Sequence, residues 1–422
     1  MAVTEPSPRA DTTVTLLAAA AFFSGAALRI CDALLPRLAH DFNVTPGAAG
    51  QVIIGFSVAY GLMQLVFGPL GDRYGKARLM CAALFGCAVG SIASALAPGF
   101  GVLVATRILW GMAAAGVIPL GIAWIGDTVP YERRQATLAR LLLGTLSGMM
   151  CGQLAGGFFA DSAAGWRGAF LMLSAGYAAV ALLMLVRIRS APSALTATTG
   201  RPRLLLQLRT VLAVPWARVV LAAAFAEGVF LLGPMSYLPA YLHTRHQVSL
   251  TAASALIALY AAGGLLYAMT ARRIVTRFGE RRMALAGGVL MGAGFLAFRL
   301  SPLAQLAGPI ALLVGFGTYL YHNTLQTHAT QMAPAVRGSS VALFAFCLFT
   351  GQALGVTLAG FLFDHFGPTP VLLVPAAALP LAGWAFAHAL QRRARTDQAL
   401  APRPRVSSAP DELPRTPERE RP

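Results

Sequence analysis

Charged residues are scarce in this chain of 422 residues, because Asp, Glu, Lys and Arg together make up 12% of it. Soluble globular proteins carry about 25% charged residues. Here 57% of the residues are hydrophobic and the mean hydropathy is +0.65. The shortage of charge excludes an ordinary soluble enzyme or binding domain and indicates a protein that folds within a bilayer.

Signatures of a soluble catalytic site or a metal site are also missing. The five cysteines fall in apolar segments without metal-ligand spacing, so we interpret them as small core residues: Cys31, Cys81, Cys87, Cys151 and Cys347. Polar loops show no Ser/His/Asp order, and no glycine-rich loop would cradle a phosphate. We therefore expect no enzyme activity, no cofactor and no metal. Residues 1–12 are polar and precede no cleavage site, so we expect no removable signal peptide.

Acidic residues are few as well, since 16 acids stand against 33 bases and give a formal net charge of +17. The bases gather in alternate connections between apolar segments, which indicates a membrane surface and not nucleic acid. The apolar segments predict twelve membrane spans, at 13–36, 46–70, 77–97, 101–127, 135–160, 166–187, 215–243, 250–270, 282–300, 304–332, 339–363 and 370–390. The positive-inside rule then places both termini in the cytoplasm of a multi-pass protein of the cell inner membrane.

The spans divide into two groups of six. Residues 190–213 are rich in Pro, Ser, Thr and Arg and predict a cytoplasmic linker between bundles at 13–189 and 214–391. Residues 1–12 form a cytoplasmic N-terminus. Residues 392–422 have too little apolar surface to bury, so we expect a disordered cytoplasmic tail.

The two groups share a sequence repeat. Arg73-Tyr74-Gly75 recurs 204 positions later as Arg277-Phe278-Gly279, and Val44-Thr45 recurs at the same offset as Val248-Ser249. A second series returns 203 positions later, with Gly148, Gly152, Gly157 and Asp161 matched by Gly351, Gly355, Gly360 and Asp364. Because an even number of spans separates the copies, they run in the same direction through the membrane. The sequence thus predicts an all-α protein of two parallel-repeat six-helix bundles around a central cavity.

The connection after the second span combines glycines with charges. It reads Gly68-Pro69-Leu70-Gly71-Asp72-Arg73-Tyr74-Gly75-Lys76-Ala77-Arg78. This stretch resembles the signature loop of the major facilitator superfamily, Gly-x-Leu-Ala-Asp-Arg-x-Gly-Arg-Lys, with matches at Gly68, Leu70, Asp72, Arg73, Gly75 and, conservatively, Lys76. Gly71 and Ala77 depart mildly from the pattern. The resemblance implies a twelve-helix alternating-access transporter in which this gating loop is locked by Asp72 against helix 11 in one access state.

Ionisable residues inside spans cost about 2.5–3.5 kcal/mol on insertion scales, so each one needs a partner or a function. Asp32 has two candidate partners: Arg107, which lies at a similar depth in the fourth span, and Arg29, one turn away on the same helix. The first pair would be functional and the second structural. The segment from Arg107 to Gly111 resembles the family's helix 4 pattern, whose arginine is implicated in proton coupling.

Glu227 in the seventh span and His322 in the tenth lie at similar predicted depths, about 17 and 15 Å from the cytoplasmic side. The resemblance implies that helices 1, 4, 7 and 10 line the cavity, so these two side chains can meet and exchange a proton. The alternative is that each bonds to a tyrosine or to backbone and only joins helices. We expect the proton-coupling set to be Asp32, Arg107, Glu227 and His322.

Small residues recur at close spacing in the fifth span, where Gly148, Gly152, Gly156 and Gly157 predict close helix packing at an interface that rocks. This segment resembles the antiporter pattern Gly-x-x-x-Gly-Pro-x-x-Gly-Gly. Gln153 replaces the proline, which weakens the indication of antiport.

The pattern as a whole predicts proton-coupled efflux of a small organic solute, and its closest resemblance is to the drug:proton antiporter branch. Candidate solute contacts are Tyr60, Gln64, Tyr237, His322, Asn323 and Gln326. Proton-coupled symport or facilitated uptake is the alternative, and a membrane sensor or an intramembrane enzyme is a remote one. Expected partners are the solute, protons and membrane lipids, with no nucleic acid, and we expect a monomer.

Overall fold

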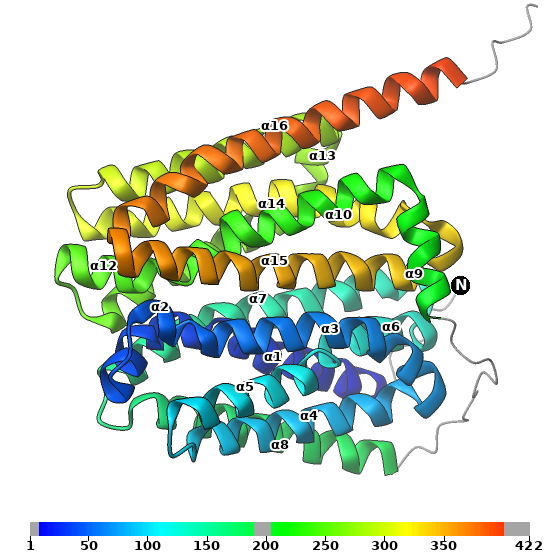
Figure 1. The fold of residues 1–422 in the computed structure, drawn as a ribbon. Coiled ribbons are helices and arrows are strands. Elements are labelled where there is room, and N and C mark those ends of the chain that lie inside the picture. The colour runs from blue at the N-terminus through cyan, green and yellow to red at the C-terminus, as the bar shows by residue number, and fades with distance from the viewer. Residues whose placement is uncertain (1–7, 190–203, 401–422) are drawn as a thin grey trace, which may run out of the picture.

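A computed structural model describes residues 8–189 and 204–400, which form helices joined by short turns (Figure 1). Helices are what long apolar runs favour in a bilayer, because a helix satisfies its backbone hydrogen bonds within the segment. The first half of the chain forms α1 (Pro8–Phe42), α2 (Pro46–Ala49), α3 (Gln51–Tyr74), α4 (Lys76–Ala95), α5 (Phe100–Ala114), α6 (Val117–Thr128), α7 (Tyr131–Asp161) and α8 (Gly165–Arg189).

The second half begins with α9 and contains one π-helical turn, η1, and two 3₁₀ turns, η2 and η3. Its elements are α9 (Leu204–Ala213), α10 (Pro215–Glu227), η1 (Gly228–Leu232), α11 (Gly233–Met235), α12 (Leu238–His246), α13 (Leu250–Leu300), η2 (Ala304–Leu306), α14 (Ala307–Gln331), η3 (Pro334–Val336), α15 (Arg337–Phe366) and α16 (Pro368–Leu400).

Eleven helical segments of the described residues are long and apolar enough to cross a membrane. One of them, α13, is 51 residues long and would extend about 76 Å if it were straight, which exceeds a bilayer. It is interrupted at Gly279, whose φ of 70° and ψ of 164° are not helical. With α13 counted as two spans, one on each side of Gly279, the described residues provide the twelve predicted spans, and spans eight and nine are joined by a kink and not by a loop.

The repeat predicted from the sequence is visible in the backbone. Gly75, between α3 and α4, has φ 87°, and its repeat partner Gly279 has φ 70°. Both values lie in the region that L side chains avoid, so glycine is required at the same point of each copy. The dipeptide repeat thus marks a shared turn geometry.

Two predicted boundaries differ from the structure. Residues 204–213 of the predicted linker form helix α9. Two contacts hold this helix against the second half: Val211 is buried in the core at 0% exposure, and Gln207 accepts a hydrogen bond of 2.8 Å from Ser339. The predicted disordered tail is helical as far as Leu400, where the Ala, Leu, Gln and Arg residues of the last turns of α16 favour helix. Residues 1–7, 190–203 and 401–422 lie outside the described residues.

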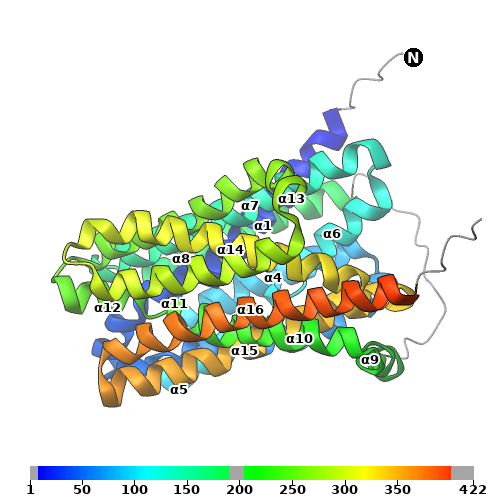
Figure 2. The same ribbon diagram turned by 90° about the horizontal axis from the view of Figure 1, so that it is seen from above.

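The helices form two bundles that lie side by side, with α1–α8 in the lower part of Figure 1 and α9–α16 in the upper part. The start of α1 and the end of α16 lie at the same end of the molecule in both views (Figures 1 and 2). We call this the near end, and we call the opposite end, which carries α2 and α12, the far end.

Buried apolar side chains form one large cluster in each half, and a small third cluster surrounds Tyr267. The cluster of the first half also includes Tyr237, Leu250 and Val356 from the second half, so the apolar core is continuous across the far end. Large apolar side chains cover much of the outer surface, for example Leu96 at 72% and Met269 at 85% exposure. A surface of this kind suits lipid and not water.

The glycines of α7 pack chiefly inside the first half. A Cβ added at Gly148, Gly152 or Gly156 would overlap the backbone of α1 at Phe22, Ala26 and Ile30. In the second half Gly351 and Gly355 contact the backbone of Phe225 and Val229 in the same way. Of the predicted set, Gly157 is the glycine that faces the opposite half, at Ser254, and its repeat copy Gly360 faces Gly47 in the same way.

Candidate functional site

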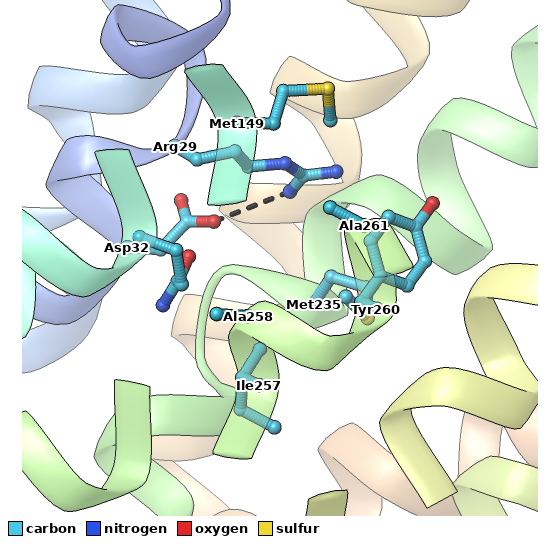
Figure 3. Close-up of a pocket in the computed structure, with 9 residues that line it drawn as sticks. Arg29, Asp32, Met149, Met235, Ile257, Ala258, Tyr260 and Ala261 are labelled. Atoms are coloured by element: carbon cyan, nitrogen blue, oxygen red, sulfur yellow. Dashed lines mark hydrogen bonds and ion pairs between the residues drawn. The ribbon is translucent and has the colours of Figure 1, made fainter. Parts of the chain in front are cut away.

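A small pocket lies between the two halves, and in this arrangement of the halves its space is about that of one water molecule (Figure 3). The first half contributes α1 and α7, and the second half contributes α11 and α13. The lining residues are Arg29, Asp32, Met149, Gln153, Met235, Ile257, Ala258, Tyr260 and Ala261.

The packing of α7 on α1 explains why α7 supplies two of these residues. Gly148 and Gly152 contact α1, and each residue that follows is turned by about 100° around the helix. Met149 and Gln153 are those next residues, and both line the pocket. The substitution of glutamine for the proline of the antiporter pattern thus places an amide in the pocket wall.

Arg29 and Asp32 form the charged part of the wall. Nη1 of Arg29 donates to Oδ2 of Asp32 at 3.2 Å, and the two residues are 6% and 2% exposed. Their i, i+3 spacing puts both side chains on one face of α1. Of the two pairings that the sequence left open, the structure contains Arg29–Asp32.

Among the described residues, Oδ1 of Asp32 and Nε2 of Gln153 have no hydrogen-bond partner of good geometry, and the Ser236 side chain lies beside the Asp32 carboxylate. Burying such an atom without a partner costs about 1–3 kcal/mol, so a bound molecule that supplies the missing hydrogen bonds is favoured. One atom accepts and the other donates. The wall is therefore suited to a group that carries both a donor and an acceptor.

The opposite wall is mainly apolar, because the second half contributes Met235, Ile257, Ala258 and Ala261. Tyr260 is its aromatic member, and the guanidinium carbon of Arg29 lies 5.6 Å from the centre of the Tyr260 ring. Figure 3 shows the Arg29–Asp32 pair on one side of the pocket and these apolar side chains on the other. The two halves thus give the pocket walls of different chemistry.

Arg107 lies on α5 in an aromatic cage and not in the pocket lining. Its guanidinium carbon is 4.2 Å from the ring centre of Phe56 and 4.6 Å from that of Trp110. Its Nε donates to the carbonyl of Val52 at 3.3 Å, and Arg107 is 2% exposed. No ion pair to Asp32 is present among the described residues, so the cage and the carbonyl stabilise this cation.

Glu227 and His322 meet in the second half. Nδ1 of His322 lies 3.0 Å from both carboxylate oxygens of Glu227, whose exposure is 1%. Glu227 ends α10 directly before the π-helical turn η1, and such turns often mark functional sites in helices. The structure thus brings together the carboxylate and the imidazole whose depths matched in the sequence.

The remaining predicted solute contacts lie outside the pocket lining. Tyr60 and Gln64 are buried on α3, and the Tyr60 ring lies 4.5 Å from that of Phe349. Asn323 donates to the hydroxyl of Tyr267 at 2.8 Å, and Gln326 is exposed.

Tyr237 is fully buried where the halves meet at the far end. Its hydroxyl donates to the carbonyl of Val356 at 3.2 Å. A Cβ added at Gly50 would overlap this hydroxyl. Tyr237 therefore fills the seam between the halves and is not part of the pocket lining.

The predicted gating loop stays within its own half. Asp72 pairs with Lys76 at 3.6 Å, and Lys76 also contacts Asp127 at the end of α6. Among the described residues no ion pair joins Asp72 to α15, the contact expected in one access state; Asp72 is turned to Lys76 and its side chain is 58% exposed. Around Gly68 there is open space, so the glycine that the backbone needs here is Gly75.

Several pocket residues were absent from the predicted contact set. Met149, Met235 and Tyr260 sit in apolar spans with no feature that separates them from core residues. Arg29 did carry a signal, because a cation inside an apolar span requires a function or a partner. Gln153 carried one as well, as the polar residue among the glycines of α7.

Comparison with known proteins gives a consistent result. The family model described as Major Facilitator Superfamily matches residues 17–347 and again residues 242–419. The chain is 26% identical over 362 residues to the inner membrane transport protein YnfM of Escherichia coli, which covers 84% of this chain and 85% of that protein. It is 28% identical over 365 residues to a chloramphenicol resistance protein of Streptomyces lividans, which covers 83% and 88% of the two chains.

Solved structures share the fold at low sequence identity. A bacterial homologue of the human lysosomal transporter Spinster, in an inward-facing and unoccupied conformation, aligns with a TM-score of 0.69 at 18% identity over 92% of this chain and 96% of that one. The nucleoside transporter NupG aligns with a TM-score of 0.71 at 14% identity over 89% and 99%. The twelve crossings, the internal repeat and the family match agree, and this multi-pass membrane protein therefore belongs to the major facilitator superfamily.

Proposed function

We propose that this transporter exports a small organic solute across the cytoplasmic membrane in exchange for protons, by alternating access to the pocket between its two halves. The observation that carries the proposal is the pocket itself, which both halves line and which holds a buried ion pair with two unpartnered polar atoms. A wall built from both halves changes its exposure when the halves move relative to each other. This is the requirement for alternating access.

The charge distribution supports a cytoplasmic near end. Arginines gather at the near-end connections, for example Arg133 and Arg134 in the first turn of α7 and Arg281 and Arg282 beside Gly279. The positive-inside rule places such connections in the cytoplasm. In this orientation both α1 and α16 have their terminal ends inside, and the far end faces outward.

The Glu227–His322 pair is the proposed site of proton uptake and release. Both groups can carry a proton, both lie in the second half, and Nδ1 of His322 is within hydrogen-bond distance of either carboxylate oxygen. A proton that binds here changes the charge of a buried site, which favours one arrangement of the halves over the other. The pocket acid Asp32 is the second candidate, because it is an ionisable group that lines the pocket.

The two walls indicate the chemistry of the solute. Asp32 Oδ1 favours a hydroxyl or amino donor, and Gln153 Nε2 favours a carbonyl or ether oxygen. The opposite wall of Met235, Ile257 and Ala258 favours an apolar body. We therefore expect an amphipathic solute with a compact polar group.

Solute identity is tested first, by accumulation in cells that express the protein, over a panel of antibiotics, sugars and amino acids. Chloramphenicol belongs in the panel because a relative is a chloramphenicol resistance protein. We expect transported compounds to combine one polar group with an apolar body. Transport of fully hydroxylated sugars alone would contradict the assignment of the apolar wall.

The direction of coupling is tested with the purified protein in proteoliposomes and a radiolabelled solute from that panel, with the membrane potential clamped. Proton exchange predicts accumulation when the lumen is acidic, because protons leave as solute enters. Symport, which the replacement of proline by Gln153 leaves as the alternative, predicts accumulation when the outer solution is acidic. Facilitated uptake predicts equilibration under both gradients. Each result is independent of how the protein is oriented in the vesicles.

A further inference from the structure

Hydrogen bonds that join the two halves gather at the far end. Both carboxylate oxygens of Asp161, the last residue of α7, accept from the start of α13: Leu250 N at 3.3 Å, Thr251 N at 2.7 Å and Thr251 Oγ1 at 2.7 Å. Both oxygens of Asp364, near the end of α15, accept from the start of α2: Thr45 Oγ1 at 2.6 Å and Gly47 N at 2.9 Å.

These two contacts are repeat copies of each other. Asp364 follows Asp161 by 203 positions, and Thr251 follows Gly47 by 204. In each copy an aspartate at the C-terminal end of one helix receives the backbone N–H of the same position at the start of a helix in the other half. The pair of contacts therefore has an approximate two-fold symmetry and spans the interface from both sides.

Helix electrostatics make each contact specific to the closed arrangement. The C-terminal end of a helix carries a partial negative charge, so an aspartate there is disfavoured by its own helix. The N-terminal ends of α13 and of α2, which runs on into α3, carry partial positive charge and unpaired N–H groups. If the halves separate at the far end, each carboxylate loses its contact with the N-terminal end of the helix in the other half. It then remains next to the negative C-terminal end of its own helix.

The backbone is shaped to permit this approach. A Cβ added at Gly157 would lie 2.5 Å from Cβ of Ser254 and 2.6 Å from the carbonyl oxygen of Leu250. A Cβ added at Gly360 would lie 2.8 Å from Cα of Gly47. Each glycine precedes its aspartate by four residues, one helical turn, so the close contact and the carboxylate belong to one face of the helix.

We propose that Asp161 and Asp364, with Gly157 and Gly360, form a two-part latch that holds the far end closed and sets the balance between the access states. The aspartates are positioning residues, because they act on the arrangement of the halves and lie outside the pocket lining. This far-end latch rests on the proposed alternating-access cycle, but its effect on distance is measurable without any solute.

Distances between spin labels test the latch in the purified full-length protein whose five cysteines are replaced by alanine. One label pair reports the far end, at His40→Cys and His365→Cys, and another reports the near end, at Tyr131→Cys and Phe278→Cys. All four positions are exposed. Asp161→Asn and Asp364→Asn keep the side-chain size and remove the charge. We expect each to raise the ratio of far-end-open to far-end-closed molecules about fivefold to tenfold, a range that allows for solvent exposure of the carboxylates, and the double variant to raise it further.

Asp41→Asn is the matched control. Asp41 is also an acid at the far end, but its bonds to Arg37, to Nε1 of Trp166 and to His40, which the label replaces in every variant, stay within the first half. We expect its distance distributions to equal those of the unsubstituted background. The near-end distance should shorten as the far-end distance lengthens in the latch variants, which simple loosening of the fold would not produce.

Unchanged distances at both label pairs in the double variant would overturn the latch. Should that variant fail to fold, Thr45→Val and Thr251→Val remove one hydrogen bond from each contact and leave the carboxylates in place. The latch then predicts a smaller shift in the same direction, and identical distributions would reject it. A shift in distance without solute transport would support the latch and refute the proposed function, so the two failures are distinguishable.

Discussion

The two halves of this transporter share a scaffold but differ in their ionisable groups. Gly75 and Gly279 adopt the same unusual backbone geometry, and Asp161 and Asp364 make the same kind of contact across the far end. The buried charges do not follow the repeat. At the 204-residue offset Asp32 corresponds to Ser236 and Glu227 corresponds to Phe23.

This difference separates two kinds of constraint. Residues that set how closely helices pack, or that hold the far end closed, must match in both halves. The two halves are related by an approximate two-fold axis and move relative to each other about it. Positions proposed to bind solute or protons need to occur only once, which agrees with an arginine–carboxylate pair in the first half and a carboxylate–imidazole pair in the second. The comparison predicts that charge substitutions will affect transport in a manner specific to each half, whereas glycine substitutions will affect stability equally in both.

The largest expected effect comes from Asp32→Ala, which leaves the buried Arg29 guanidinium without its carboxylate. Removing one partner of a buried pair costs about 3–5 kcal/mol, so thermal unfolding of the purified protein should begin at a markedly lower temperature, and transport should be lost. The double variant Arg29→Met, Asp32→Leu should recover most of the stability but no transport. Full stability of Asp32→Ala would show that the pair contributes little to the fold.

Glu227→Gln tests the second half. In a one-to-one exchange, a pH gradient of about one unit supports about tenfold accumulation of solute. A tenfold difference in proton concentration and a tenfold difference in solute concentration each correspond to about 1.4 kcal/mol. The variant should lose this accumulation and retain solute exchange without a gradient, as measured in the proteoliposomes described above.

The matched control for that variant is Glu280→Gln. Glu280 contacts His328 at 3.1 Å in the same half, but its side chain is 48% exposed. It should leave accumulation unchanged. Equal losses in both variants would remove the assignment of Glu227.

Gly152→Ala and Gly355→Ala test the shared scaffold with a smaller effect. Each added methyl group would overlap backbone of the neighbouring helix, at Ala26 in the first half and Val229 in the second. Overpacking of this kind costs about 1–3 kcal/mol, and the two variants should lower the unfolding temperature by similar amounts. A large loss in one half and none in the other would show that the halves are packed by different rules.

Gly75→Ala and Gly279→Ala should have the smallest effect. Both positions combine positive φ with an extended ψ, 126° at Gly75 and 164° at Gly279, a region nearly restricted to glycine in which an L side chain costs about 1–3 kcal/mol; a Cβ at Gly279 would add no overlap, because it would meet open space. Similar small losses of stability in the two variants, measured by thermal unfolding, would confirm that the repeated dipeptide exists for its turn geometry. A loss confined to Gly75→Ala would instead point to the gating loop.

Much of the fold followed from the sequence because its signals are local. Span length, the 203- and 204-residue repeat and the glycine pattern are properties of neighbouring residues, and they predicted the twelve crossings and the two parallel copies. The meeting of Glu227 and His322 followed from equal depth in two helices that the family resemblance placed at the cavity.

The partner of Asp32 did not follow, because it depends on how a neighbouring helix is rotated. Arg107 has a suitable depth, but α5 turns its side chain toward Phe56 and Trp110, and Arg29 on the same helix takes the carboxylate instead. The position of Tyr237 in the seam and outside the pocket lining did not follow either, since depth alone does not show which face of a helix is turned to the pocket. Helix α9 was not predicted, because the Pro and Arg residues just before it indicated an irregular linker. The three leucines at its start favour a buried helix.

The division of the pocket between a polar α1–α7 wall and an apolar α11–α13 wall has a consequence for how selectivity evolves. In the proposed cycle, the first half of the protein contacts the polar group of the solute and the second half contacts its apolar body. A chimaera that joins residues 1–189 to the second half of a relative should therefore keep the demand for a particular polar group while exchanging one preference in size and shape for another.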